Sequence, residues 1–263
     1  MSEDCALPKM AGYFYPSDKL ELDKYLNDFF KGEPLVNRKP VSLIVPHAGY
    51  IFSGEIAGKA FNILNHYKDD FDTIVVVGPS HHVLIDKPAV LNKDYILPNG
   101  KLKRDEILIE QLVKEDLVEI NDEAHKKEHS VEVELPFICR INPNFKIVDI
   151  ITGPYEQDSV TKLIDALFKI PRTLIIISSD LSHFNLYEKA KEIDKSTIKN
   201  VLALNEDDIQ PDDACGSIGI RALIKVAKKY MLKPKVLGYC NSGDKTSNKL
   251  QVVGYASFGF FNS

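Results

Sequence analysis

Short apolar runs rich in β-branched residues alternate along the chain with stretches in which apolar residues recur every three or four positions. The runs are bounded by Pro, Gly, Ser or Asp and predict strands at Ser42–Val45, Thr73–Val77, Lys146–Ile151, Thr173–Ile177, Lys235–Gly238 and Gln251–Phe261. The helical spacing predicts helices at Ser17–Phe30, Gly54–Asn65, Arg104–Lys114, Ser159–Phe168, Leu186–Leu204 and Cys215–Tyr230. Strands alternating with helices predict a layered α/β sandwich around a mixed or mostly parallel sheet.

The chain shows no internal repeat, low-complexity tract or linker, so we expect residues 1–263 to form a single domain. The segment Leu84–Gly100, which is rich in Pro, Asp and Asn, is expected to be a strand-and-turn excursion near the sheet edge. Hydrophobic residues make up 44% of the chain and charged residues 27%. This balance is typical of a soluble protein with a substantial core.

Charge and cysteine usage exclude several classes of protein. The formal net charge of -5 gives no general attraction to nucleic acid or to anionic membrane surfaces. No apolar run reaches the ~18 residues that span a bilayer, and the N-terminus lacks a signal-peptide pattern, so a cytoplasmic location is expected. The four cysteines form no CxxC pair, which favours free thiols over disulfides or a zinc knuckle.

Histidines follow three of the predicted strands at the point where each strand ends. His47 follows the first strand, His81 the second, and Asp180 and His183 the fourth. Loops at the carboxyl ends of strands in an open α/β sheet meet in one crevice, where ligands bind. Two histidines with one carboxylate suit zinc or non-haem iron and leave positions open for substrate. Each histidine alone is explained as a turn residue, but three such positions among seven histidines favour a metal site.

The segment Glu128–Phe137 is a further motif, in which acidic and apolar residues alternate. The alternation fits an edge strand, and a Ser-x-x-Glu spacing loosely fits a helix start, so both remain open. Glu128 and His129 either supply a ligand or an acid/base group, or they cap a helix and are solvated there. His66 and His125 lie in polar surroundings away from strand ends and are expected to be structural.

The segment Tyr239–Asp244 follows another predicted strand. Its Ser, Gly and Asp residues first indicate a turn. If the strand runs parallel to the others, Cys240 or Asp244 faces the same crevice and is placed to complete a metal site.

Six motifs together resemble the Memo family, and the resemblance extends nearly from end to end: Ala11–Pro16, Pro46–Tyr50, Gly78–His82, Glu128–Glu132, Ser178–His183 and Asn241–Asp244. That family is similar in fold to the class III extradiol ring-cleaving dioxygenases, which hold iron(II) through two histidines and a carboxylate. The resemblance implies a three-layer α/β domain. It also implies that His47 and His81 are metal ligands and that Asp180 and His183 line the same pocket.

One departure from the family concerns the third ligand. Animal members have a further cysteine ligand in the C-terminal loop, where this chain has Lys245. A protonated amine has no lone pair to donate, so lysine is a poor ligand at neutral pH. Asp244 is the third ligand we predict, with the alternatives Cys240, Asp180 and Glu128.

The first functional hypothesis is a non-haem iron oxygenase-like enzyme that takes a small oxygenated or aromatic substrate. Iron(II) is the expected metal, with copper or zinc as alternatives. Asp180 or Asp244 would give the anionic ligand. His183 or His129 would act as general acid or base, since an imidazole titrates near neutrality.

The second hypothesis is a metal-handling or peptide- and protein-binding module that uses the same pocket without catalysis. The resemblance also implies partners, because prokaryotic members accompany an AMMECR-type protein and a radical SAM enzyme. A homodimer is the default assembly. Metal-assisted hydrolysis, with a zinc-bound water between His183 and Asp180, ranks below oxygen chemistry. No nucleophile elbow, phosphate loop or dinucleotide fingerprint is present.

Overall fold

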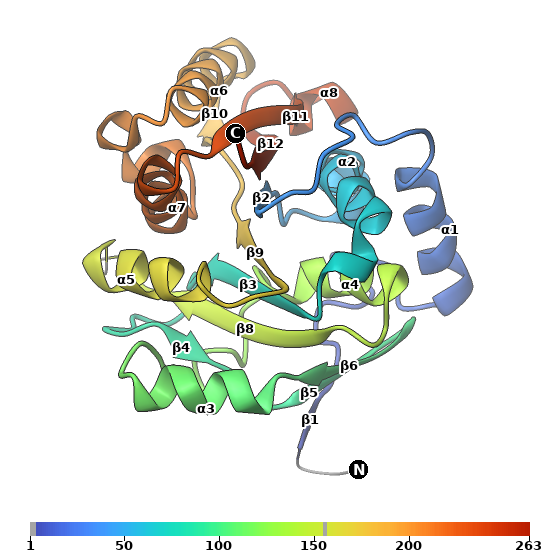
Figure 1. The fold of residues 1–263 in the computed structure, drawn as a ribbon. Coiled ribbons are helices and arrows are strands. Elements are labelled where there is room, and N and C mark those ends of the chain that lie inside the picture. The colour runs from blue at the N-terminus through green and yellow to red at the C-terminus, as the bar shows by residue number, and fades with distance from the viewer. Residues whose placement is uncertain (1–3, 155–156) are drawn as a thin grey trace.

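The middle of the central sheet is parallel (Figure 1). The computed structural model describes residues 4–154 and 157–263. Across the sheet, the parallel strands are β6 (Gly100–Arg104), β8 (Lys146–Thr152), β3 (Thr73–Pro79), β9 (Thr173–Ser178) and β2 (Ser42–Val45). Strands β2, β3 and β9 are buried along nearly their whole length, as expected of parallel strands covered on both faces.

Antiparallel strands extend the sheet beyond β2. Strand β12 (Val252–Phe261) pairs with β2, and β11 (Lys233–Asn241) pairs with β12. Both pairings are antiparallel, so β11 runs in the same direction as β2. The short strands are β1 (Cys5–Ala6), β4 (Ala89–Val90), β5 (Asp94–Leu97), β7 (Glu119–Ile120) and β10 (His183–Asn185).

Helices cover both faces of the sheet and make three layers (Figure 1). Neighbouring residues of a strand point to opposite faces. In β2, Leu43 and Val45 therefore pack with α1 (Lys19–Phe29), α2 (Tyr50–His66) and α4 (Leu135–Ile141). Ile44 enters the second core, formed with α3 (Glu106–Lys114), α5 (Gln157–Leu167), α6 (Tyr187–Leu202) and α7 (Ser217–Lys229). The short helices are η1 (Lys68–Asp70), η2 (Glu132–Glu134), η3 (Glu206–Asp208), η4 (Pro211–Asp213) and α8 (Ser242–Lys245).

The fold class and the six predicted strands are confirmed, and the six predicted helices are present with ends shifted by a few residues. The third predicted helix starts at Glu106 because the Asp105 carboxylate caps it by accepting from the backbone N–H of Leu108. The excursion Leu84–Gly100 contains β4 and β5. The segment Glu128–Phe137, for which the sequence fits either an edge strand or a helix start, forms no strand. It forms η2 and the beginning of α4. None of the described helices is long and apolar enough to cross a bilayer.

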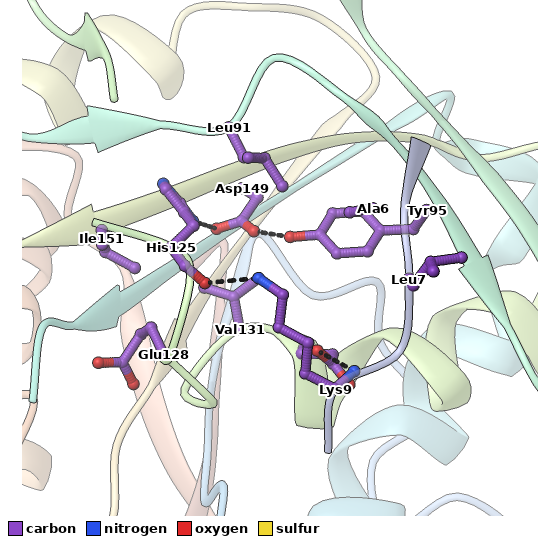
Figure 2. A pocket seen from close by; sticks show the side chains of 11 residues that line it. Ala6, Leu7, Lys9, Leu91, Tyr95, His125, Glu128, Val131, Asp149 and Ile151 are labelled. Atoms are coloured by element: carbon purple, nitrogen blue, oxygen red, sulfur yellow. Dashed lines mark hydrogen bonds and ion pairs between the residues drawn. The ribbon is translucent and has the colours of Figure 1, made fainter. Parts of the chain in front are cut away.

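Glu132 anchors the N-terminal segment to the domain. Its carboxylate accepts hydrogen bonds from the backbone N–H groups of Lys9 and Met10, at 3.1 and 2.7 Å, and from the Tyr15 hydroxyl at 2.7 Å. Lys9 and Glu132 line a water-sized cavity of about 10 Å³ (Figure 2). Three donors on one buried carboxylate fix the segment that presents Phe14 to His129, whose ring centroids lie 4.7 Å apart.

His125 belongs to the same cavity lining. Its Nδ1 lies 3.3 Å from the Asp149 carboxylate, and its Nε2 lies 3.2 Å from the Ala89 carbonyl. Both imidazole nitrogens therefore face acceptors, and the Tyr95 hydroxyl donates to the same Asp149 carboxylate. Although burial alone lowers the pKa of His125, the Asp149 carboxylate raises it above its ordinary value. His125 is a buried partner of Asp149, in agreement with the structural role predicted for it.

A Glu132→Ala variant is expected to unfold more easily than the parent. The substitution leaves two backbone N–H groups and the Tyr15 hydroxyl without their acceptor, at a cost of about 1–3 kcal/mol for each group that stays unpaired. Urea denaturation measures the change in the free energy of unfolding. Glu110→Ala, on the exposed side of α3, is the control and is expected to change this free energy by less than about 0.5 kcal/mol. Equal stability of the two variants would contradict the anchoring role.

Candidate metal centre

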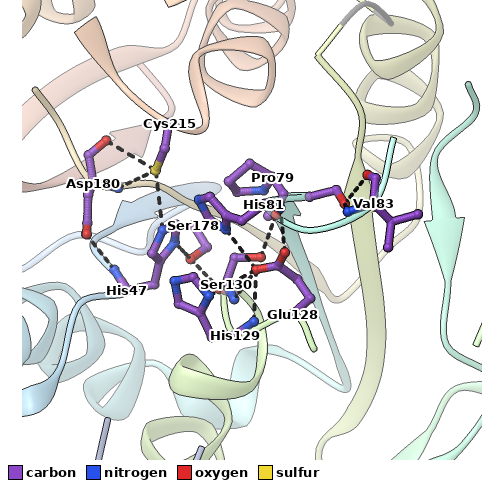
Figure 3. A network of polar contacts seen from close by, with 12 residues as sticks. His47, Pro79, His81, Val83, Glu128, His129, Ser130, Ser178, Asp180 and Cys215 are labelled. Atoms are coloured by element: carbon purple, nitrogen blue, oxygen red, sulfur yellow. Dashed lines mark hydrogen bonds and ion pairs between the residues drawn. The ribbon is translucent and has the colours of Figure 1, made fainter. Parts of the chain in front are cut away.

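Three potential ligand atoms meet at the carboxyl edge of the sheet (Figure 3). They belong to His47, His81 and Cys215, and all lie within 4.8 Å of one another. His47 follows β2 and His81 follows β3, while Cys215 comes two residues before α7. The Cys215 Sγ lies 3.3 Å from the His47 Nε2. His47 is buried, Cys215 is half-buried and His81 is exposed, so the group is open to solvent on one side.

The His47 ring is held in place through its Nδ1 atom. Its Nδ1 lies 2.7 Å from the Ser178 Oγ at the end of β9, which leaves Nε2 directed at Cys215. The backbone N–H of His47 donates to the Asp180 carboxylate at 2.9 Å, which fixes the loop after β2. Burial lowers the pKa of His47 well below its ordinary value. The ring is therefore neutral near pH 7 and presents a lone pair at Nε2.

Glu128 orients the His81 ring. One carboxylate oxygen lies 2.9 Å from the His81 Nδ1, and the other accepts the backbone N–H of His81 at 2.6 Å. A carboxylate on the far nitrogen of a ligating histidine fixes the tautomer and directs the other nitrogen to the metal. Although burial alone would raise it, hydrogen bonds from His81 and from backbone N–H groups hold the pKa of Glu128 well below its usual range.

A second group of potential ligands, His81 with Glu128 and His129, is better explained by this orienting role. Besides the His81 ring, the same Glu128 oxygen accepts the backbone N–H groups of His129 and Ser130, at 2.9 and 3.0 Å. Three donors already fill its lone pairs. Gly78 allows the segment around Ser130 to lie close to the end of β3, because a Cβ at position 78 would lie 2.5 Å from the Ser130 Oγ.

Cys215 was not among the predicted site residues. The sequence gives it only the place of a helix start, and it contacts His47 across 168 positions of the chain. Gly216 allows the segment that carries Cys215 to lie close to Ser179, since a Cβ at position 216 would lie 2.7 Å from the Ser179 Cβ. Burial, together with the Asp180 carboxylate, raises the pKa of the Cys215 thiol to about 12. Without a metal the group is therefore a thiol.

The predicted catalytic residues surround this group but differ in their roles. The Asp180 carboxylate is engaged with the backbone of the His47 loop, and burial raises its pKa to about 7. His129 lies between Phe14 and His81, and burial lowers its pKa to about 4. Burial also lowers the pKa of His183, which is on β10. Both histidines are thus neutral near pH 7, and the lowered pKa makes each a weaker base than an ordinary imidazole.

The predicted third ligand, Asp244, is not brought to the pair of histidines. Strand β11 does run in the direction of β2, as that prediction required, but the chain turns at once into α8. There the Asp244 carboxylate accepts from the Tyr187 hydroxyl at 2.6 Å and from the backbone N–H of Asn241 at 2.9 Å. The Asp244 carboxylate therefore caps the start of α8 and is directed at its own loop rather than at the histidines. Asp244 and Cys240 belong to neither ligand group among the described residues, and Lys245 forms an ion pair with Glu55.

A cavity of about 140 Å³ opens beside Cys215. Among the residues that the structure describes, its walls carry no charged side chain and include Pro79, Ser80, Thr152 and Ser217. The cavity is large enough for a small molecule, and Cys215 belongs both to its lining and to the ligand group. The described part of this wall offers neutral polar groups to a bound molecule.

Comparisons with known proteins agree with these observations. The family model described as "Memo-like protein" matches residues 7–259. A MEMO1 family protein of Methanocaldococcus jannaschii is 34% identical in an alignment that covers 95% of this chain and 96% of that protein. A MEMO1 family protein of Sulfolobus acidocaldarius is 32% identical in an alignment that covers 97% of this chain and 98% of that protein.

A solved structure extends the comparison to the fold. The crystal structure of an uncharacterized protein from Escherichia coli K12 superposes with a TM-score of 0.54 and 13% sequence identity. The match covers 86% of this chain and all of that chain. At this identity the likeness concerns the fold alone.

Proposed function

This chain belongs to the Memo family, and we propose that it binds one metal ion through the Nε2 atoms of His47 and His81 and the Sγ of Cys215. The observation that supports the proposal is the convergence of these three donors from three distant segments. In both histidines Nδ1 is engaged by a protein oxygen, so Nε2 is left free to ligate.

The donor set narrows the choice of metal. Imidazole nitrogens suit iron, copper and zinc, while a thiolate favours the softer copper(I), zinc and thiolate-bound iron. We propose iron(II) or copper(I). A ligand set of two histidines and a thiolate favours copper(I) more than a set of two histidines and a carboxylate would. The exposed side at His81 leaves room for a further ligand.

The proposed activity is oxidation of a small oxygenated substrate. A bound redox-active metal would supply electron transfer to dioxygen. The chain itself supplies the cavity beside Cys215, whose described lining is uncharged and would orient a small molecule. His129 and His183, neutral near pH 7, would accept a hydrogen bond from such a substrate.

A second function, in which the same centre holds metal while a partner docks at its rim, is favoured by Phe184. This residue directly follows His183, is 70% exposed, and has a backbone φ of 58°. An aromatic residue in a left-handed conformation is strained, and such strain clusters at functional positions. An exposed aromatic next to His183 is suited to contact a peptide or protein.

Metal reconstitution tests the proposal and separates the two functions. Protein incubated with iron(II) or copper(I) without oxygen and then desalted is expected to retain about one ion per chain. Oxygen uptake in the presence of a panel of catechols and other small oxygenated molecules would then support the enzyme. Retained metal with no uptake would support the binding function, and no retained metal would refute the centre itself.

Cobalt(II) identifies the sulfur ligand. The parent is expected to show a thiolate-to-cobalt charge-transfer band that disappears in Cys215→Ser, because a hydroxyl oxygen is not a thiolate. Cys240→Ser is the matched control, since Cys240 is also half-buried but contacts the Phe52 carbonyl rather than a histidine. Loss of the band in Cys240→Ser and its survival in Cys215→Ser would reverse the assignment.

A further inference from the structure

Glu134 is a fully buried acidic residue at the back of the proposed centre, at the end of η2. One of its carboxyl oxygens lies 2.9 Å from the Ser178 Oγ, and the other has no hydrogen-bond partner. Among the residues that the structure describes, the charged group acting on it is the Asp180 carboxylate, and no cation pairs with it. A buried carboxylate in this position would be costly if it were ionised.

The hydrogen bonds of Ser178 determine the protonation state of Glu134. The Ser178 Oγ makes three short contacts: to the Ser130 carbonyl at 2.6 Å, to His47 Nδ1 at 2.7 Å and to Glu134 at 2.9 Å. A hydroxyl has one hydrogen to donate and two lone pairs to accept with. Because the Ser130 carbonyl only accepts, the Ser178 hydrogen belongs to that contact.

The other two partners must then donate to Ser178. His47 does so when its proton is on Nδ1, and Glu134 does so when its carboxyl group is protonated. An ionised Glu134 that accepted from Ser178 would leave the Ser130 contact, at 2.6 Å, with two oxygens and no hydrogen between them. One assignment of protons therefore satisfies all three contacts. Burial, which raises the pKa of Glu134 well above its ordinary value, agrees with it.

We infer that Glu134 is a positioning residue: a protonated carboxylic acid that, through Ser178, holds His47 in the tautomer whose Nε2 lone pair faces the metal. This inference rests on the proposed metal centre for its functional consequence. Glu134 donates to Ser178, Ser178 donates to Ser130, and the remaining lone pair of Ser178 is available to the His47 N–H. His47 thus has an uncharged support, whereas His81 has the ionised carboxylate of Glu128.

Infrared spectroscopy of the metal-free protein tests the protonation directly. The spectra are recorded at a pH above 7, where Asp180, whose pKa burial raises to about 7, is ionised. The difference spectrum of the parent minus Glu134→Gln is then expected to contain the C=O stretching band of a protonated carboxylic acid. Glu128→Gln is the matched control, since Glu128 is also buried in the same segment but is ionised, and its difference spectrum should lack that band. Absence of the acid band from the Glu134 difference spectrum would overturn the inference.

Cobalt(II) affinity tests the positioning. Glu134→Gln keeps an N–H donor for Ser178 and should bind cobalt(II) within about threefold of the parent. Glu134→Leu and Ser178→Ala remove the support and should bind about 10–100-fold more weakly, as is typical when the partner of a ligating histidine is lost. Thermal melts establish that each variant is folded. A folded Glu134→Leu protein with parental affinity would refute the positioning role. Failure of the parent to bind metal would refute the centre, while the infrared band still decides the protonation of Glu134.

Discussion

A His47→Ala/His81→Ala double variant is expected to retain no metal under conditions that give the parent about one ion per chain. Zinc held by four ligands in small domains contributes roughly 10–16 kcal/mol, which is about 3 kcal/mol per ligand. Loss of two ligands therefore costs about 6 kcal/mol, or about four orders of magnitude in affinity. Elemental analysis after anaerobic reconstitution measures the metal content, and competition with a chromophoric chelator measures the affinity.

The control for this variant is His66→Ala. His66 is exposed at the end of α2, where its ring contacts Tyr67, and it belongs to neither ligand group among the described residues. Its replacement should leave the metal content unchanged. The double variant should still fold, because neither ring is part of the apolar cores, and its thermal melt checks this. Equal metal content in the parent and in the folded double variant would exclude these histidines as ligands.

The fold and the two histidines could be predicted from the sequence because the signals are local. A buried parallel strand is an apolar run, and the residue after it must lie at the carboxyl edge of the sheet. His47 and His81 each follow such a run within two residues, so the sequence places both in the crevice. The same reasoning failed for Asp244, because the direction of β11 was right but the side chain turns back to cap α8.

The remaining parts of the site depend on contacts that no local pattern encodes. Cys215 meets His47 only because Gly216 lets the start of α7 approach the end of β9. Glu134 alternates with apolar residues and fits an exposed edge position, yet η2 turns it fully into the interior. In both cases the decisive information is packing between segments far apart in the chain, which hydrophobic periodicity does not report.

Metal affinity is expected to rise about tenfold for each pH unit above neutrality. The Cys215 thiol, with its pKa near 12, is protonated in the metal-free protein, but it must lose its proton to ligate. Binding therefore releases one proton, and raising the pH favours the bound state. His47 adds no proton of its own because its pKa is lowered far below neutrality by burial. Between pH 7 and pH 9 the affinity should increase about a hundredfold.

Calorimetry in buffers of different ionisation enthalpy counts the released proton directly. The range above pH 7 is the informative one, because Asp180, with a pKa near 7, would add a second proton at lower pH. The Cys215→Ser variant should bind about a hundredfold more weakly, for the loss of about 3 kcal/mol from one ligand, and its affinity should no longer depend on pH. Release of no proton by the parent would mean that sulfur is not a ligand. Release of one proton by both proteins would assign it to a group other than the thiol, so the comparison separates sulfur ligation from every other source of pH dependence.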